Sequence, residues 1–424
     1  MRRQHRNGAG RCGFTMVELL VAMALIVFIM YILAEAFSAG AKTFRDLKAV
    51  GDLNTRLRTA TSTLRRLLSA DHFEGRKRLS DPNFWQEGPP RMGFFRIWQN
   101  SAPTNTTGAA YFNEGNDLDN APSFRARDHG MHFTVRLRGG QRSDYFRATV
   151  PAGSPLLSLP QPDSRYQDGT NEYTSSWAEV AVFLRPVPGG EDTEDPNATS
   201  GSPLPLNTLY LRQRLLVPSR DDVDSIGAVP SGQANQYLEV SQFADGTNLA
   251  FNTPADITMP ARRFGNSTPP SLALNVAPLN YPRLQDESTT LSGSDVLLTD
   301  VISMEIRVLL GSEGYVGAEE NFIHLFDGQI DKYRMMFTGN PPGQTANSEI
   351  PNTARVFDTW SQLKDDKWDY STWARVDQRS GQAIPMFSNV VGTKPIRIRA
   401  IQIALRIWDN KTKQTRQVSL IQDM

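Results

Sequence analysis

The sequence predicts an α+β fold in which one long N-terminal helix packs on a head built around an antiparallel β-sheet. Three patterns predict it. Residues 14–34 form an apolar run of 21 residues whose single charge is Glu18. Leucines then recur every three or four residues as far as about Ala70, the spacing of one helix face. Beyond Asp81-Pro82, several segments alternate apolar and polar residues, as half-buried strands do.

The N-terminal segment changes character at one residue. Residues 1–13 hold four arginines and no acid, and the apolar run begins directly at Phe14. A helix of 21 apolar residues crosses the hydrocarbon core of a bilayer, which is about 30 Å thick. Because basic residues flank its start, we expect a single-pass anchor with its N-terminus in the cytoplasm.

A secretory signal peptide and an ordinary signal anchor are the alternatives. A signal peptide has a shorter apolar core that ends in small residues, whereas the small pair here is interrupted by a carboxylate, at Ala34-Glu35-Ala36. A signal anchor accounts for the run itself. It does not account for Gly13 directly before the run or for Glu18 within it.

The residues from Gly13 to Leu20, GFTMVELL, resemble the prepilin cleavage and methylation motif of type IV pilins and type II secretion pseudopilins. The resemblance implies that a prepilin peptidase cuts after Gly13 and methylates the new amine of Phe14. It also implies that Glu18, the fifth residue after the cut, serves filament assembly. The resemblance covers about the first 30 residues.

Two further features bear on the subtype. Many major pilins carry a proline in the middle of this helix, where the present chain has Glu35, which favours a pseudopilin or minor pilin. The Leu- and Arg-rich helix followed by strands is similar to the J-type minor pseudopilin, although this chain is longer than that subunit. The K-type subunit typically lacks the glutamate.

The strand signals follow in order along the chain. They lie at His132–Arg138, Trp177–Leu184, Leu209–Leu216, Ile302–Leu310, Ile396–Trp408 and Arg416–Ile421. The alternation slips between Ile398 and Ile401, which predicts a bulge. Asp409-Asn410-Lys411 is typical of a turn, so the last two strands are expected to form a hairpin.

These patterns divide the chain into four parts. We expect a leader at 1–13, a transmembrane helix at 14–40, its amphipathic continuation at 41–80 and a β-rich periplasmic head at 81–424. Polar stretches rich in proline, glycine and asparagine, at 99–123, 186–206, 252–283 and 339–355, are expected to be surface loops.

Charge and motif content favour a structural protein. Without the four leader arginines, the 45 basic residues fall to 41 against 45 acids, so nothing points to nucleic-acid binding. The single cysteine, Cys12, lies in the leader.

His129 and His132 form an HxxH without a third ligand, which we interpret as surface or turn chemistry. The acidic segments 191–195 and Asp221-Asp222-x-Asp224 could ligate calcium but are more often only solvated. Trp360, Trp368 and Trp373 are expected to anchor a core.

The sequence therefore predicts no enzyme, no cofactor and no metal site. The expected function is that of a minor pseudopilin of a type II secretion pseudopilus, which helps initiate or cap a filament that extrudes folded proteins. The alternatives are a minor type IV pilin of a surface pilus, and a signal-anchored periplasmic binding protein or enzyme. The expected partners are prepilin peptidase, other pilin-like subunits, inner-membrane lipid and secreted cargo.

Overall fold

The computed structural model describes most of the helix and the central sheet. The residues described are 15–84, 90–99, 111–116, 122–126, 129–161, 171–186, 206–226, 229–245, 247–259, 262–264, 295–311, 321–324, 355–359, 375–376, 383–384, 397–409 and 414–424.

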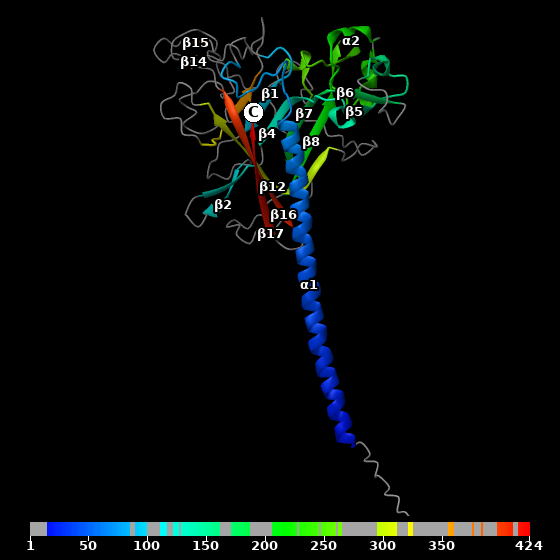
Figure 1. The fold of residues 1–424 in the computed structure, drawn as a ribbon, viewed down its shortest axis with the longest axis vertical. Coiled ribbons are helices and arrows are strands. Elements are labelled where there is room, and N and C mark those ends of the chain that lie inside the picture. The colour runs from blue at the N-terminus through cyan, green and yellow to red at the C-terminus, as the bar shows by residue number, and fades with distance from the viewer. Residues whose placement is uncertain are drawn as a thin grey trace, which may run out of the picture.

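One helix dominates the N-terminal part of the chain. α1 runs over Met16–Leu68, which is 53 residues without a proline and therefore about 80 Å of helix. Its first half projects away from the head, and its second half lies against it (Figure 1). α1 ends at Leu68, where the amide of Ser69 donates to the carbonyl of Arg65. The predicted continuous helix to about Ala70 is confirmed.

The head contains short helices and many strands. The helices are α2 (Arg220–Ser225) and the 3₁₀ turns η1 (Arg142–Asp144), η2 (Pro155–Ser158), η4 (Ser231–Gln236) and η5 (Asp256–Thr258). The strands are β1 (Phe95–Gln99), β2 (Tyr111–Asn116), β3 (Pro122–Ala126), β4 (His129–Arg136), β5 (Phe146–Thr149), β6 (Glu172–Ser175), β7 (Trp177–Pro186), β8 (Asn207–Leu215), β9 (Val229–Pro230), β10 (Gln242–Asp245), β11 (Asn248–Phe251), β12 (Val296–Leu310), β13 (Arg355–Asp358), β14 (Arg375–Val376), β15 (Ala383–Ile384), β16 (Ile398–Asp409) and β17 (Gln414–Asp423).

Eight of these strands form one sheet in the order β13-β1-β4-β7-β8-β12-β16-β17. Every neighbouring pair in it is antiparallel. The fold is therefore α+β, with a long N-terminal helix packed on an antiparallel sheet head, as predicted.

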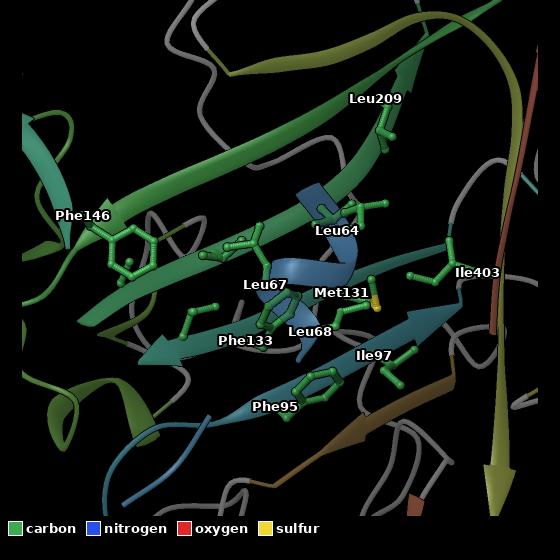
Figure 2. Close-up of a cluster of buried hydrophobic side chains, with 14 of the residues drawn as sticks. Leu64, Leu67, Leu68, Phe95, Ile97, Met131, Phe133, Phe146, Leu209 and Ile403 are labelled. Carbon is green, nitrogen blue, oxygen red and sulfur yellow. The ribbon is translucent and has the colours of Figure 1, made fainter. Parts of the chain in front are cut away.

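The main core lies between α1 and one face of this sheet. The buried residues of α1 are Leu53, Leu57, Ala60, Leu64, Leu67 and Leu68. Figure 2 shows the end of the helix over the strands, with Leu64, Leu67 and Leu68 among side chains of β1, β4 and β16. The leucine stripe is thus the surface that fixes the helix to the head.

A salt bridge links the helix to the sheet near the N-terminal end of the packed segment. Arg56 on α1 donates to the carboxylate of Asp300 at 3.1 Å and to the hydroxyl of Thr299 at 2.6 Å. Asp300 has a φ of 59°, and the register of β12 against β8 shifts between Leu298 and Val301. Aspartate tolerates this left-handed conformation better than most residues. The irregular backbone of β12 therefore presents both acceptors to α1.

The six predicted strands correspond to β4, β7, β8, β12, β16 and β17. The predicted slip in β16 is confirmed, because Leu309 pairs with Ala400 but Leu310 pairs with Ile398, which leaves Arg399 unmatched. β17 returns along β16 as the predicted hairpin strand.

The second face of the sheet is also covered, which the alternation does not predict. Trp98, Ala181, Phe183, Tyr210 and Phe264 form a separate buried cluster there. Gly130 on β4 makes room for it, since a Cβ at that position would lie 2.1 Å from the indole Cζ2 of Trp98.

Two predicted surface loops are wrong in part. Within 99–123, β2 and the start of β3 pair as an antiparallel ladder. Within 252–283, Asn252, Thr253, Asp256 and Arg263 are buried. In this second segment the polar composition was misleading, because the buried side chains bond to one another, to Ser241 and to Asp358 of β13. The other two predicted loops lie almost wholly outside the described residues.

Candidate functional site

The site that the sequence singles out lies at the N-terminus of α1. Glu18 occupies the third position of the helix, and Thr15 is its N-cap. The backbone N–H of Thr15 donates to Oε2 of Glu18 at 3.0 Å, and the Thr15 hydroxyl donates to the same oxygen at 3.1 Å. The amide of Glu18 is 3.3 Å from the Thr15 hydroxyl oxygen, which completes a reciprocal capping box.

This cap follows from the local sequence. The first amides of any helix lack carbonyl partners, and a threonine with a glutamate three residues later satisfies two of them. The partial positive charge of the helix N-terminus also favours a carboxylate there. The sequence reading identified Glu18 from its position after Gly13 but missed Thr15, whose signal was the T-x-x-E spacing.

The capping box leaves part of the carboxylate open. Both bonds from Thr15 go to Oε2, and Oε1 accepts no hydrogen bond from any described residue. Glu18 is also exposed, as are all residues of α1 up to Lys48. The carboxylate is therefore oriented toward the start of the helix through Oε2. Gly13 and Phe14, the predicted cleavage and methylation residues, lie outside the described residues.

The first half of α1 presents apolar side chains on every side. It is the one helix in the described part of the chain that is long and apolar enough to cross a membrane. Large apolar residues from Met16 to Leu33 are exposed all round it. Such a surface requires a lipid or protein environment, because water would expose all of its apolar area. α1 therefore fits a single-pass membrane anchor.

The interpretation of the HxxH as surface or turn chemistry is wrong, because both histidines are buried in β4. Residues three apart on a strand point to opposite faces. Nδ1 of His129 accepts a hydrogen bond from the amide of Ile306 at 3.0 Å, while Nε2 of His132 lies 3.0 Å from Oε1 of Glu179. The two rings therefore cannot ligate one metal ion, and each belongs to a different buried contact.

Burial lowers the pKa of both histidines. Desolvation lowers the pKa of His132, and it lowers that of His129 well below its ordinary value, with the neighbouring His324 adding to the effect. Glu305 lies beside His324, with its Oε1 at 2.8 Å from Nε2, and its pKa is about 2. Desolvation acts to raise this pKa, but the bonds and charges of His324 and Arg307 outweigh it.

A second buried group of charges fixes the 252–264 segment to the sheet. Arg263 forms a two-pronged pair with Asp358 of β13, at 2.7 and 3.2 Å. Glu179 accepts from the hydroxyl of Ser241 at 2.5 Å and from the amide of Phe264 at 3.0 Å. These bonds join segments that are distant in sequence, which is why no local pattern indicates them. Their chemistry is structural, since each carboxylate already has partners.

The remaining candidates do not form a site in the described residues. Asp221, Asp222 and Asp224 lie on the short helix α2, where Asp224 pairs with Arg220 at 3.0 Å. Among all the residues that the structure describes, no group of three or more His, Cys, Asp or Glu side chains is placed to hold a metal ion. The acidic segment 191–195 lies outside the described residues, as do Trp360, Trp368 and Trp373.

Comparison with known proteins identifies the N-terminus. The family described as the prokaryotic N-terminal methylation motif matches residues 9–33. This range contains Gly13, Phe14, the Thr15–Glu18 cap and most of the exposed apolar helix. No curated protein and no solved structure matches the chain. The chain therefore carries the N-terminal methylation motif that is the signature of type IV pilins and pseudopilins.

Proposed function

We propose that the chain is a minor pseudopilin, a structural subunit that helps initiate or cap a type II secretion pseudopilus that extrudes folded proteins. The observation that carries the proposal is the methylation motif placed in register on α1. That helix is exposed and apolar in its first half and fixed to a sheet head in its second. The absence of a mid-helix proline favours a pseudopilin or minor pilin over a major pilus subunit, and the Leu- and Arg-rich helix followed by strands favours a J-like subunit.

In this proposal the chain is made as a precursor. Prepilin peptidase removes residues 1–13 by cutting after Gly13 and methylates the amine of Phe14. The mature helix lies in the inner membrane with its N-terminus cytoplasmic and residues 81–424 as the periplasmic head. The four leader arginines support this orientation. Mass spectrometry of the native N-terminal peptide tests it: an intact Met1, or a cut near Ala36, contradicts the proposal.

Glu18 is proposed to pair with the amine of a neighbouring subunit. A carboxylate in lipid is costly unless it is hydrogen-bonded, paired or protonated. Thr15 supplies two hydrogen bonds to Oε2 but no charge, so Oε1 remains able to accept from a cation. The methylated amine of Phe14 in a neighbour supplies that cation. The attraction would draw an incoming subunit into register in the filament.

The chain offers a matched control for this role. Glu35 is also a carboxylate on the exposed part of α1, but it lies outside the matched motif. We expect Glu18→Leu to be processed and inserted like the unmodified chain and to lose crosslinking to the other pilin-like subunits. Glu35→Leu should retain it. Unchanged recovery of subunits with Glu18→Leu at equal membrane abundance contradicts the pairing.

The assay for secretion separates a pseudopilus from a surface pilus. Deletion of the gene should abolish release of folded exported proteins while leaving surface fibres intact. Loss of fibres with normal release would instead identify a minor type IV pilin. Normal release and normal fibres would favour a signal-anchored protein of another kind.

A further inference from the structure

The two edges of the main sheet differ in length and regularity. β13 forms one edge and has four residues. β17 forms the other with ten residues, and it pairs with β16 over ten consecutive positions without a register shift. Short or bulged edges resist pairing with another strand, whereas a long regular edge is a template for it. β17 is thus the edge able to accept a strand.

The hydrogen bonding of Met424 shows which backbone groups face outward. Its amide donates to the carbonyl of Arg399 on β16 at 2.9 Å. In an antiparallel ladder, every second residue faces the partner strand. Counting back from Met424, the even-numbered residues of β17 bond to β16. The odd-numbered residues, which include Thr415, Gln417, Ser419 and Ile421, direct their N–H and C=O groups toward the open edge.

The side chains of β17 leave this edge accessible. Leu420 is buried in the core under α1, which fixes the strand in place. Ile421 points to the other face and is 51% exposed. Residues 414–417 are exposed on both faces. β17 contains no proline, and its two charged residues, Arg416 and Asp423, lie outside the stretch 417–422.

The direction of β17 restricts what can pair with it. Arg56 contacts Asp300 near the start of β12, and Ser80, which follows α1, donates to the carbonyl of Met424. β12 and β17 therefore both run away from the membrane, as α1 does. Antiparallel pairing of β17 with β17 of a second copy would reverse the second helix. Two anchors in one membrane cannot adopt that arrangement. β13 of a second copy would run in the required direction, because it lies seven strands from β17 in an antiparallel sheet, but it offers four residues against the ten of β17. A strand that matches the length of β17 is therefore taken to come from a different subunit.

We infer that β17 accepts an extended strand from the head of a neighbouring pilin-like subunit, which becomes the ninth strand of the sheet. The inference rests on the proposed function, because it takes the neighbour to be a subunit whose helix packs along the exposed part of α1. β17 lies against α1, so a neighbour in that position has its head beside this edge. Backbone hydrogen bonds would provide the affinity, and an apolar residue over Ile421 the register.

The experiment uses the full-length chain in native membranes, with Ser419→Pro as the test and Ser419→Ala as the matched control. Proline removes the outward N–H of Ser419 and blocks the edge, but breaks no bond to β16. A second variant, Ile421→Lys, leaves the backbone intact and places a charge at the edge. The readout is recovery of the other pilin-like subunits after crosslinking, with melting of the detergent-purified variants as the folding control.

We expect Ser419→Pro and Ile421→Lys to fold and to recover at least about tenfold less of a neighbouring subunit, while Ser419→Ala recovers it fully. A photocrosslinker at Gln417 should attach to a head strand of that subunit. Full recovery with both edge variants overturns the inference. If the unmodified chain itself recovers no pilin-like subunit, the proposed function fails. If it recovers them and the Gln417 adduct maps to a helix or to another class of protein, only the strand pairing fails.

Discussion

Acidification should destabilise the head, because burial lowers the pKa of three of its histidines. Burial lowers the pKa of His72, His129 and His132 from the ordinary 6.5. Below that value the unfolded chain binds protons that the folded head does not, so the free energy of unfolding falls as pH falls. Each such histidine contributes a slope of up to about 1.4 kcal/mol per pH unit, and three together up to about 4.

The measurement is urea unfolding of the chain in detergent micelles at pH 7.5, 6.5 and 5.5, followed by tryptophan fluorescence. Stability should change little between the first two values and fall steeply toward the third. Glu305 does not contribute to the change in stability between pH 7.5 and 5.5. Its pKa of about 2 means that it stabilises the head above its ordinary value of 4.5 and loses that effect only at lower pH.

His129→Asn is the diagnostic variant. The asparagine oxygen can still accept from the amide of Ile306, as Nδ1 of His129 does at 3.0 Å, but the residue no longer binds a proton. The slope below pH 6.5 should therefore fall by up to about 1.4 kcal/mol per pH unit. Equal slopes for the variant and the unmodified chain, or a head that gains stability in acid, would refute the assignment of His129 as a buried neutral group.

Three further predictions concern the head and its helix. Leu64, fully buried under the sheet, should cost about 3–5 kcal/mol of unfolding free energy when changed to alanine, while the exposed Arg65→Ala should cost about 0.5 or less, both measured by urea unfolding. Gly130→Ala should cost about 1–3 kcal/mol in the same assay, because the added methyl overlaps the ring of Trp98. Deleting the first 40 residues should leave a soluble, cooperatively unfolding head, since the first buried residue of α1 is Leu53; an aggregated product would show that the core needs the membrane half.

The parts of the fold that the sequence predicts are those with a local period. The leucines of α1 recur at helical spacing, and all of those from Leu53 to Leu68 lie in the core. The bulge in β16 was visible because one extra residue shifts the alternation by one position. Both signals depend only on neighbours within a few residues, so no knowledge of the rest of the chain is needed to detect them.

The parts that the sequence does not predict depend on contacts between distant segments. Burial of His132 is compensated by Glu179, and that of Arg263 by Asp358, 95 residues further along the chain. A polar residue in a polar stretch gives no local sign that such a partner exists. The same limit applies to β17, since its place at an edge of the sheet that the structure describes follows from the strand order and not from its composition.

The first half of α1 and the edge of β17 are both incomplete surfaces, but they impose different conditions on the subunit. Water cannot satisfy the apolar side chains in the first half of α1, so this surface requires lipid or another apolar surface. Water does satisfy the outward N–H and C=O groups of β17, so the edge can remain unpaired in a lone subunit at little cost. In the proposed filament, a neighbour replaces lipid around the helix, whereas it only displaces water from the edge of β17. In that proposal, the move of the helix from lipid to the filament sets whether a subunit joins, and strand pairing sets which neighbour it joins.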